Sequence, residues 1–172
     1  DESEGIAVFG ISGVAASSAL KSVKLPVPEV MKRAAFDDGQ VVRVEDTRFL
    51  VAVKAASAGA LWQSLATNTR PVGVPAWQWL DIQSALPLIS ESTKEHFVPQ
   101  MANFERIGGV SFHKGCYPGQ EIVARTQYLG KLKRRLYLVH IDSNLAGTQR
   151  GTHVYSPELP GQAIGMIADV AN

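Results

Sequence analysis

The chain has 172 residues, 45% of them apolar and 19% charged, and its net charge is +1. This composition supports a packed core, excludes disorder by composition, and gives no overall electrostatic case for nucleic acid or membrane. One cysteine excludes an internal disulfide and suits a reducing compartment. The acidic residues 1–4 lack a signal-peptide pattern, and no apolar run reaches the about 20 residues of a membrane helix. We therefore expect a soluble protein of the cytoplasm (or of the mitochondrial matrix in a eukaryote), with no membrane partner.

The first third of the chain predicts an α+β unit. The apolar run at 5–10 predicts a buried strand, and the small residues at 14–21 predict a helix packed close to its sheet. Residues 41–45 and 48–53 predict a two-stranded hairpin, and a second helix begins at Ser57. The order strand, helix, two strands, helix is that of a split βαβ, or ferredoxin-like, unit.

The middle of the chain predicts a third helix at 76–83, with Pro75 in its first turn. A short helix at 99–106 and a short strand at 110–112 follow.

The C-terminal part predicts strands at 135–141, 152–155 and 163–168, separated by Gly and Pro turns. This pattern indicates the start of a small antiparallel β-barrel. We therefore expect two domains, residues 1–128 and 129–172.

The single cysteine lies in a tight turn. Pro118-Gly119 is the preferred central pair of a type II turn, and residues 120–127 predict a short helix. A helix N-terminus and the nearby Lys114 both favour the ionised form of the Cys116 thiol. A lone cysteine is more often a buried small hydrophobe, but the turn favours a functional thiol here.

His113 lies three residues before Cys116 and suggests a metal pair. Iron–sulfur clusters usually need about four protein ligands. We therefore expect no metal bound by this chain alone, while a cluster shared with a partner's thiols stays open.

Three segments carry a family resemblance. Residues 114–121 read Lys-Gly-Cys-Tyr-Pro-Gly-Gln-Glu, preceded by Phe-Val-Pro-Gln-Met-Ala-Asn-Phe at 97–104 and Gly-Val-Ser-Phe at 109–112. They closely resemble the YgfZ-type folate-binding proteins, which share a superfamily with the aminomethyltransferase (T-protein) of the glycine cleavage system. The family signature Lys-Gly-Cys-Tyr-x-Gly-Gln-Glu is matched at every specified position, and the resemblance covers nearly the whole chain. Family members are longer, so the chain resembles the middle and late parts of such a protein.

The resemblance implies a protein that binds tetrahydrofolate or a derivative and assists the assembly or repair of iron–sulfur clusters. Its partners would be folate and iron–sulfur enzymes, such as the radical-SAM enzymes that thiomethylate tRNA. The family's functional thiol carries over to Cys116. The other motif positions carry over as its shell, Lys114, Tyr117, Gln120 and Glu121, and as its backbone turn, Gly115 and Gly119.

Simpler roles stay open for the shell: Lys114 as an exposed cation, Tyr117 as a packing aromatic, and Glu121 as a partner of the helix dipole. Related aminomethyltransferases have a glutamate that contacts the pterin at the position of Gln83, and glutamine keeps one acceptor but loses the charge. The predicted cofactor-binding residues are Gln83, Asn103, Gly115, Gly119 and Arg125.

A basic cluster follows the motif, formed by Arg125, Lys131, Lys133, Arg134 and Arg135. The first interpretation is a solvated linker and strand edge, because charges discourage edge pairing between sheets. The second is a contact for folate's glutamate tail or for RNA phosphates. Direct RNA contact stays open, and no sequence motif supports it.

Three functions therefore compete. The first is a tetrahydrofolate-binding iron–sulfur maintenance factor, which would not be a classical enzyme. The second is a folate-dependent one-carbon transferase similar to the aminomethyltransferases; these lack the cysteine motif, so residues 114–121 argue against it. The third is a non-catalytic module in which the motif is a docking surface.

Overall fold

The computed structural model describes residues 3–141 and 147–171. The chain forms two compact units, Asp1–Val72 and Gly73–Asn172. The predicted division after residue 128 lies inside the second unit and stays a prediction. No helix in the described ranges is long and apolar enough to cross a membrane.

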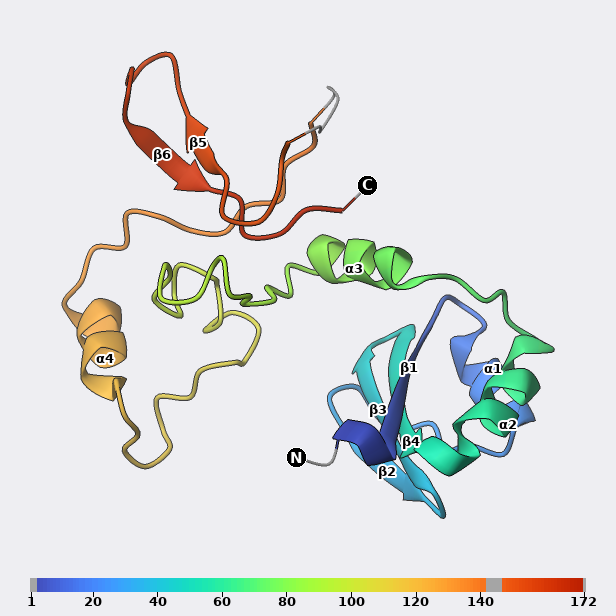
Figure 1. The fold of residues 1–172 in the computed structure, drawn as a ribbon. Coiled ribbons are helices and arrows are strands. Elements are labelled where there is room, and N and C mark those ends of the chain that lie inside the picture. Colours follow the sequence, from blue (N-terminus) through green and yellow to red (C-terminus); the bar gives the residue numbers. More distant parts are fainter. Residues whose placement is uncertain (1–2, 142–146, 172) are drawn as a thin grey trace. The chain divides into compact units, whose positions relative to one another are not determined.

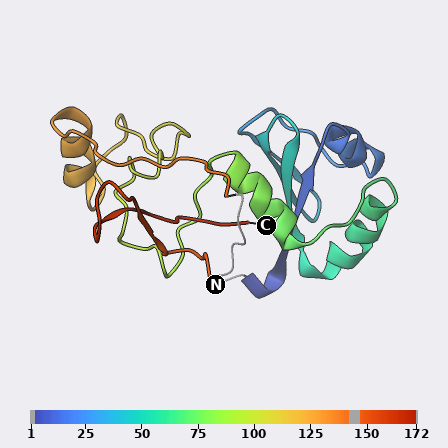
Figure 2. The same ribbon diagram turned by 90° about the horizontal axis from the view of Figure 1, so that it is seen from above.

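The first unit is a four-stranded antiparallel sheet with both of its α-helices on one face (Figures 1 and 2). Its elements, in chain order, are the 3-10 turn η1 (Ser3–Gly5), β1 (Ile6–Ser12), α1 (Ala16–Ser22), β2 (Arg33–Phe36), β3 (Gly39–Glu45), β4 (Arg48–Lys54) and α2 (Ala55–Ala66). The strand order is β1-β4-β3-β2, and every neighbouring pair is antiparallel. The α+β class is confirmed, but the ferredoxin-like topology is not, because a βαβ unit pairs parallel strands.

The core of the first unit lies between the sheet and the two helices. Strand alternation directs Phe49, Val51 and Val53 of β4 to one face, and all three are buried. Leu20 of α1 and Leu65 of α2 pack in the same buried cluster as Phe49 and Val51. This burial explains why the predicted strands and helices form where the apolar pattern places them.

Strand β2 was not predicted. Its sequence, Arg-Ala-Ala-Phe, is short and contains two alanines, which have little strand propensity. It forms because the turn at Asp37-Asp38 folds it back on β3, where Phe36 pairs with Gly39. The formation of this strand therefore depends on its pairing with β3 and not on the strand propensity of its residues.

The second unit contains α3 (Val74–Gln83), α4 (Gln120–Tyr128), β5 (His153–Tyr155) and β6 (Ala163–Met166). Helix α3 is the predicted third helix, with Pro75 in its first turn. The two strands form an antiparallel hairpin (Figure 1). They match two predicted strands, and the described residues contain no closed barrel.

Three predicted elements of the second unit are wrong. Residues 110–112 and 135–141 are not strands, since no described strand pairs with them. Residues 99–106 form successive turns instead of a helix. Asn103 interrupts them because its φ of 58° is left-handed, which a right-handed helix cannot accommodate.

Polar side chains hold the segment 97–107 in place. Gln100 is 2% exposed and donates from Nε2 to the carbonyl oxygen of Val123 in α4, at 2.7 Å. Asn103 donates from Nδ2 to the carbonyl oxygen of Leu136 at 2.9 Å. These bonds tie the segment before the cysteine motif to the helix and to the chain that follow it.

A second polar tie joins α3 to the end of the chain. Arg150 binds the Asp169 carboxylate through two bonds, from Nε at 2.7 Å and from Nη2 at 2.9 Å. Gln78 of α3 donates from Nε2 to Asp169 Oδ1 at 2.8 Å. One carboxylate thus connects three segments of the second unit.

Candidate functional site

The cysteine motif forms the predicted type II turn. Gly119 has φ 82° and ψ −2°, the values of the second central residue of that turn, and its positive φ is costly for any other residue. The Gln120 N–H donates to the Tyr117 carbonyl oxygen at 3.1 Å and closes the turn. In return, the Tyr117 N–H donates to Gln120 Oε1 at 3.2 Å. This reciprocal pair fixes the turn at the start of α4.

Cys116 lies directly before this turn, and its thiol is free and exposed. The Nζ atom of Lys114 lies 4.5 Å from the centroid of the Tyr117 ring, which is a cation–π contact. The expectation of a functional thiol needs an accessible sulfur, and the structure provides one. The alternative of a buried small hydrophobe is wrong.

An aromatic contact closes the loop that carries the thiol. The rings of Phe112 and Tyr128 meet edge to face, with centroids 6.1 Å apart. Phe112 precedes the motif and Tyr128 ends α4, so the contact joins the two ends of the loop. The pair was missed from sequence, because no periodicity links residues 16 positions apart across a turn.

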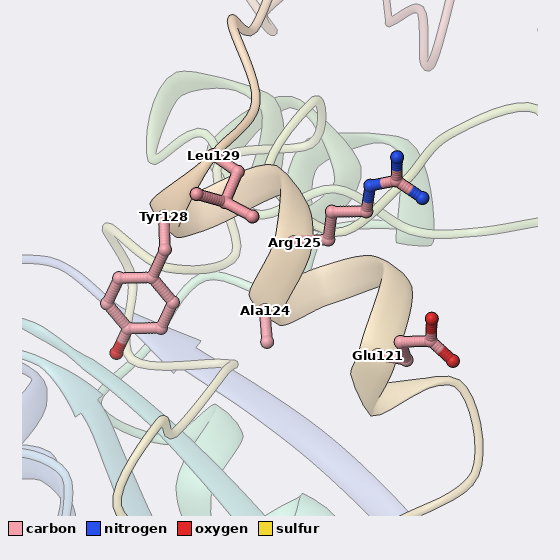
Figure 3. Close-up of a pocket in the computed structure, with 5 residues that line it drawn as sticks. All are labelled: Glu121, Ala124, Arg125, Tyr128 and Leu129. Atoms are coloured by element: carbon pink, nitrogen blue, oxygen red, sulfur yellow. The ribbon is translucent and has the colours of Figure 1, made fainter.

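One face of α4 borders a shallow, open hollow of about 460 Å³. Figure 3 shows the Arg125 guanidinium reaching away from the helix axis, with the Tyr128 ring projecting from another part of the same helix. The hollow therefore combines an apolar wall with one cation and one carboxylate. Its lining residues are Glu121, Ala124, Arg125, Tyr128 and Leu129.

The remaining predicted residues lie elsewhere. Gln83 is the last residue of α3 and is exposed. Asn103 is 8% exposed, and its Oδ1 accepts a hydrogen bond from Arg135 Nη1 at 3.1 Å. Neither Gln83, Asn103 nor Cys116 lines the hollow. The predicted folate contacts of Gln83 and Asn103 stay predictions, and the structure gives Asn103 a structural role.

Gln100 is a residue whose importance sequence reasoning missed. It lies within the family-like segment 97–104, yet only the structure shows its buried amide bound to the α4 backbone. In the described ranges, no three His, Cys, Asp or Glu side chains gather as a metal site would.

Comparison with known proteins gives one consistent name. No protein-family model matches the chain. It is 43% identical over 96 residues to the tRNA-modifying protein YgfZ of Colwellia psychrerythraea, covering 56% of this chain and 29% of that protein. It is 39% identical over 142 residues to the YgfZ protein of Hamiltonella defensa, which covers 80% of this chain and 42% of that protein. It is 34% identical over 134 residues to the YgfZ protein of Enterobacter sp. strain 638, which covers 76% of this chain and 41% of that protein. The chain thus spans less than half the length of these curated relatives.

Proposed function

Because the chain belongs to the YgfZ-type proteins, we propose that it is the thiol-bearing part of a folate-binding protein that supports tRNA modification by maintaining iron–sulfur clusters. The names of its relatives support the tRNA part of this proposal. The observation that carries the iron–sulfur part is the exposed Cys116 sulfur beside a glycine-fixed turn.

An open thiol suits work on a cluster held by another protein. A thiolate is the usual ligand of iron in such clusters, and a full set needs about four. Cys116 supplies one sulfur, and the client enzyme's own thiolates supply the others. The thiol needs to be accessible at the surface for this exchange, because the cluster is substrate and not a resident group.

The residues around Cys116 position it. Gln120 holds the turn through its bond from the Tyr117 N–H. Lys114, two residues before Cys116, holds its ammonium group over the Tyr117 ring. Glu121 lies in the first turn of α4, where a carboxylate interacts favourably with the helix dipole. Gly115 and Gly119 supply the backbone on either side of the thiol.

Within the described chain, we assign the contact with folate to the shallow, open hollow on α4. Its volume lies in the range of about 300–1,000 Å³ typical of small-molecule sites. Arg125 suits the carboxylates of the glutamate tail, and the Tyr128 ring offers a flat apolar wall. Gln83, exposed at the end of α3, lies outside this hollow, so its amide is a separate candidate for contact with a pterin.

Titration calorimetry with tetrahydrofolate tests this assignment. Replacing Arg125 with Gln removes a charged hydrogen bond, which we expect to weaken the affinity by about tenfold or more. Arg106→Gln is the matched control, because Arg106 is also exposed but lies outside the hollow. The absence of binding by the unmodified protein would remove folate from the proposal.

The role of the thiol is tested in cells that lack the protein. Plasmids supply the unmodified protein, Cys116→Ser, Cys116→Ala, or Ser111→Ala as a control at a nearby exposed position. We expect both cysteine variants to leave thiomethylated tRNA nucleosides, measured by mass spectrometry, at the level of the empty plasmid. Normal levels with Cys116→Ala would instead favour a docking module with an incidental thiol.

A further inference from the structure

The chain contains a strongly basic segment, although its net charge is close to zero. Residues 122–141 contain five Lys and Arg residues and no Asp or Glu, whereas the whole chain has a net charge of +1. The rest of the chain is therefore net acidic by four charges. Such a separation of charge creates a local positive field even when the overall balance does not.

Most of these cations are available to a partner. Lys131, Lys133 and Arg134 are exposed, and none forms an ion pair with another described residue. Arg135 differs, because its Nη1 lies 2.6 Å from Glu105 Oε1. Among the described residues, Arg135 is therefore held by an ion pair, whereas Lys131, Lys133 and Arg134 are not.

Two exposed ring side chains follow these charges in the sequence. Tyr137 is 76% exposed, and His140 is exposed beyond it. The segment 131–140 is neither helix nor strand. A membrane-binding basic segment is usually an amphipathic helix, so this conformation argues against lipid. Exposed cations followed directly by an exposed aromatic ring instead suit single-stranded nucleic acid, which stacks its bases on rings and places its phosphates beside Lys and Arg.

We propose that residues 131–140 form a binding surface for single-stranded RNA, with Lys131, Lys133 and Arg134 at the phosphates and Tyr137 stacked on a base. The surface deepens the proposed role in tRNA modification and takes its biological meaning from it. Binding itself needs neither folate, nor a cluster, nor the Cys116 thiol. It can therefore be tested separately from the proposed function.

Fluorescence anisotropy with a labelled single-stranded RNA of mixed sequence measures the binding. Each phosphate contact contributes a salt slope of about −0.7 on single strands, so the Lys131→Gln/Lys133→Gln/Arg134→Gln variant should have a slope smaller by about 2. The same relation gives an affinity loss of about 100-fold at 0.1 M salt. The control Lys21→Gln/Lys24→Gln/Lys32→Gln removes three exposed cations of the first unit and should lose far less.

The tyrosine separates base stacking from simple charge attraction. Tyr137→Ala should weaken binding at least about fivefold, and Tyr137→Phe should restore it, because stacking needs the ring and not the hydroxyl. Cys116→Ala should bind RNA like the unmodified protein, even if the cluster proposal fails. Equal losses from both triple variants, no RNA binding by the unmodified protein, or binding only to phosphatidylserine vesicles would each overturn the proposal.

Discussion

The two compact units are stabilised by different interactions. In the first, the sheet and its helices bury large side chains such as Phe49, Leu20 and Val51. In the described part of the second, the fully buried large side chains are the polar Gln100 and Thr93. Individual hydrogen bonds and ion pairs therefore shape the second unit. The comparison indicates that the stability of the unit carrying Cys116 depends on a few specific polar contacts. The stability of the first unit depends on the burial of its large apolar side chains.

The largest expected effect is that of a substitution that disrupts the packing of the first unit. Phe49 is fully buried, so Phe49→Ala should lower the free energy of unfolding by about 3–5 kcal/mol through the cavity that it leaves. The control is Val8→Ala on the same sheet, since Val8 is 59% exposed. Urea denaturation measures both variants. Equal losses would contradict the assignment of the core.

A smaller effect should follow when the polar tie of the second unit is broken. Asp169→Asn removes the charge that Arg150 binds through two bonds, with an expected cost of about 1.5–3 kcal/mol. Glu158→Gln is the control, because Glu158 is exposed and its carboxylate forms no ion pair with another described residue. Hydrogen exchange at residues 163–166 reports the loss. Unchanged protection there would show that the hairpin does not depend on this contact.

The motif glycines offer a comparison within the site. Gly119→Ala places a side chain at φ 82° and should cost about 1–2 kcal/mol, because an L residue in the left-handed region is strained. Gly115→Ala should be nearly neutral, since no atom lies within 4 Å of its added Cβ and its φ is not in that region. Faster hydrogen exchange at the Gln120 amide, which closes the turn, measures the difference. A similar effect of both changes would mean that the turn is not held as described.

The smallest effect is a pH dependence in the first unit. A hydrogen bond from Ser57, together with Lys54, lowers the pKa of Asp38 below its ordinary 3.8. The stability that Asp38 contributes is therefore complete above 3.8 and is lost as the pH falls through its lower folded pKa. NMR titration should show the pKa of Asp38 rising towards 3.8 in Ser57→Ala. No movement would exclude Ser57 as the main cause.

The two units also differ in how much of their structure the sequence could predict. In the first unit, apolar periodicity correctly placed β1, β3, β4 and both helices, because burial against a single core follows local pattern. In the second unit, the same approach placed a helix at 99–106 and a strand at 135–141, and both are wrong. Side-chain bonds across the chain, such as those of Gln100 and Asn103, determine these segments and leave no periodic signal.

The candidate site was predicted where local chemistry decides it. The Pro118-Gly119 pair alone predicted the type II turn, and the helix that follows begins at Gln120 as expected. The Phe112–Tyr128 contact and the hollow on α4 could not be predicted, because both depend on how the loop closes in three dimensions.

The most direct measurement is the rate at which iodoacetamide alkylates Cys116 at neutral pH, in the folded protein and in denaturing urea. In the second unit, the Cys116 sulfur is exposed beside its turn. We therefore expect alkylation of the folded protein to be at least about as fast as that of the unfolded chain. Protection of the folded thiol by orders of magnitude would contradict this expectation, and with it the proposed role of Cys116.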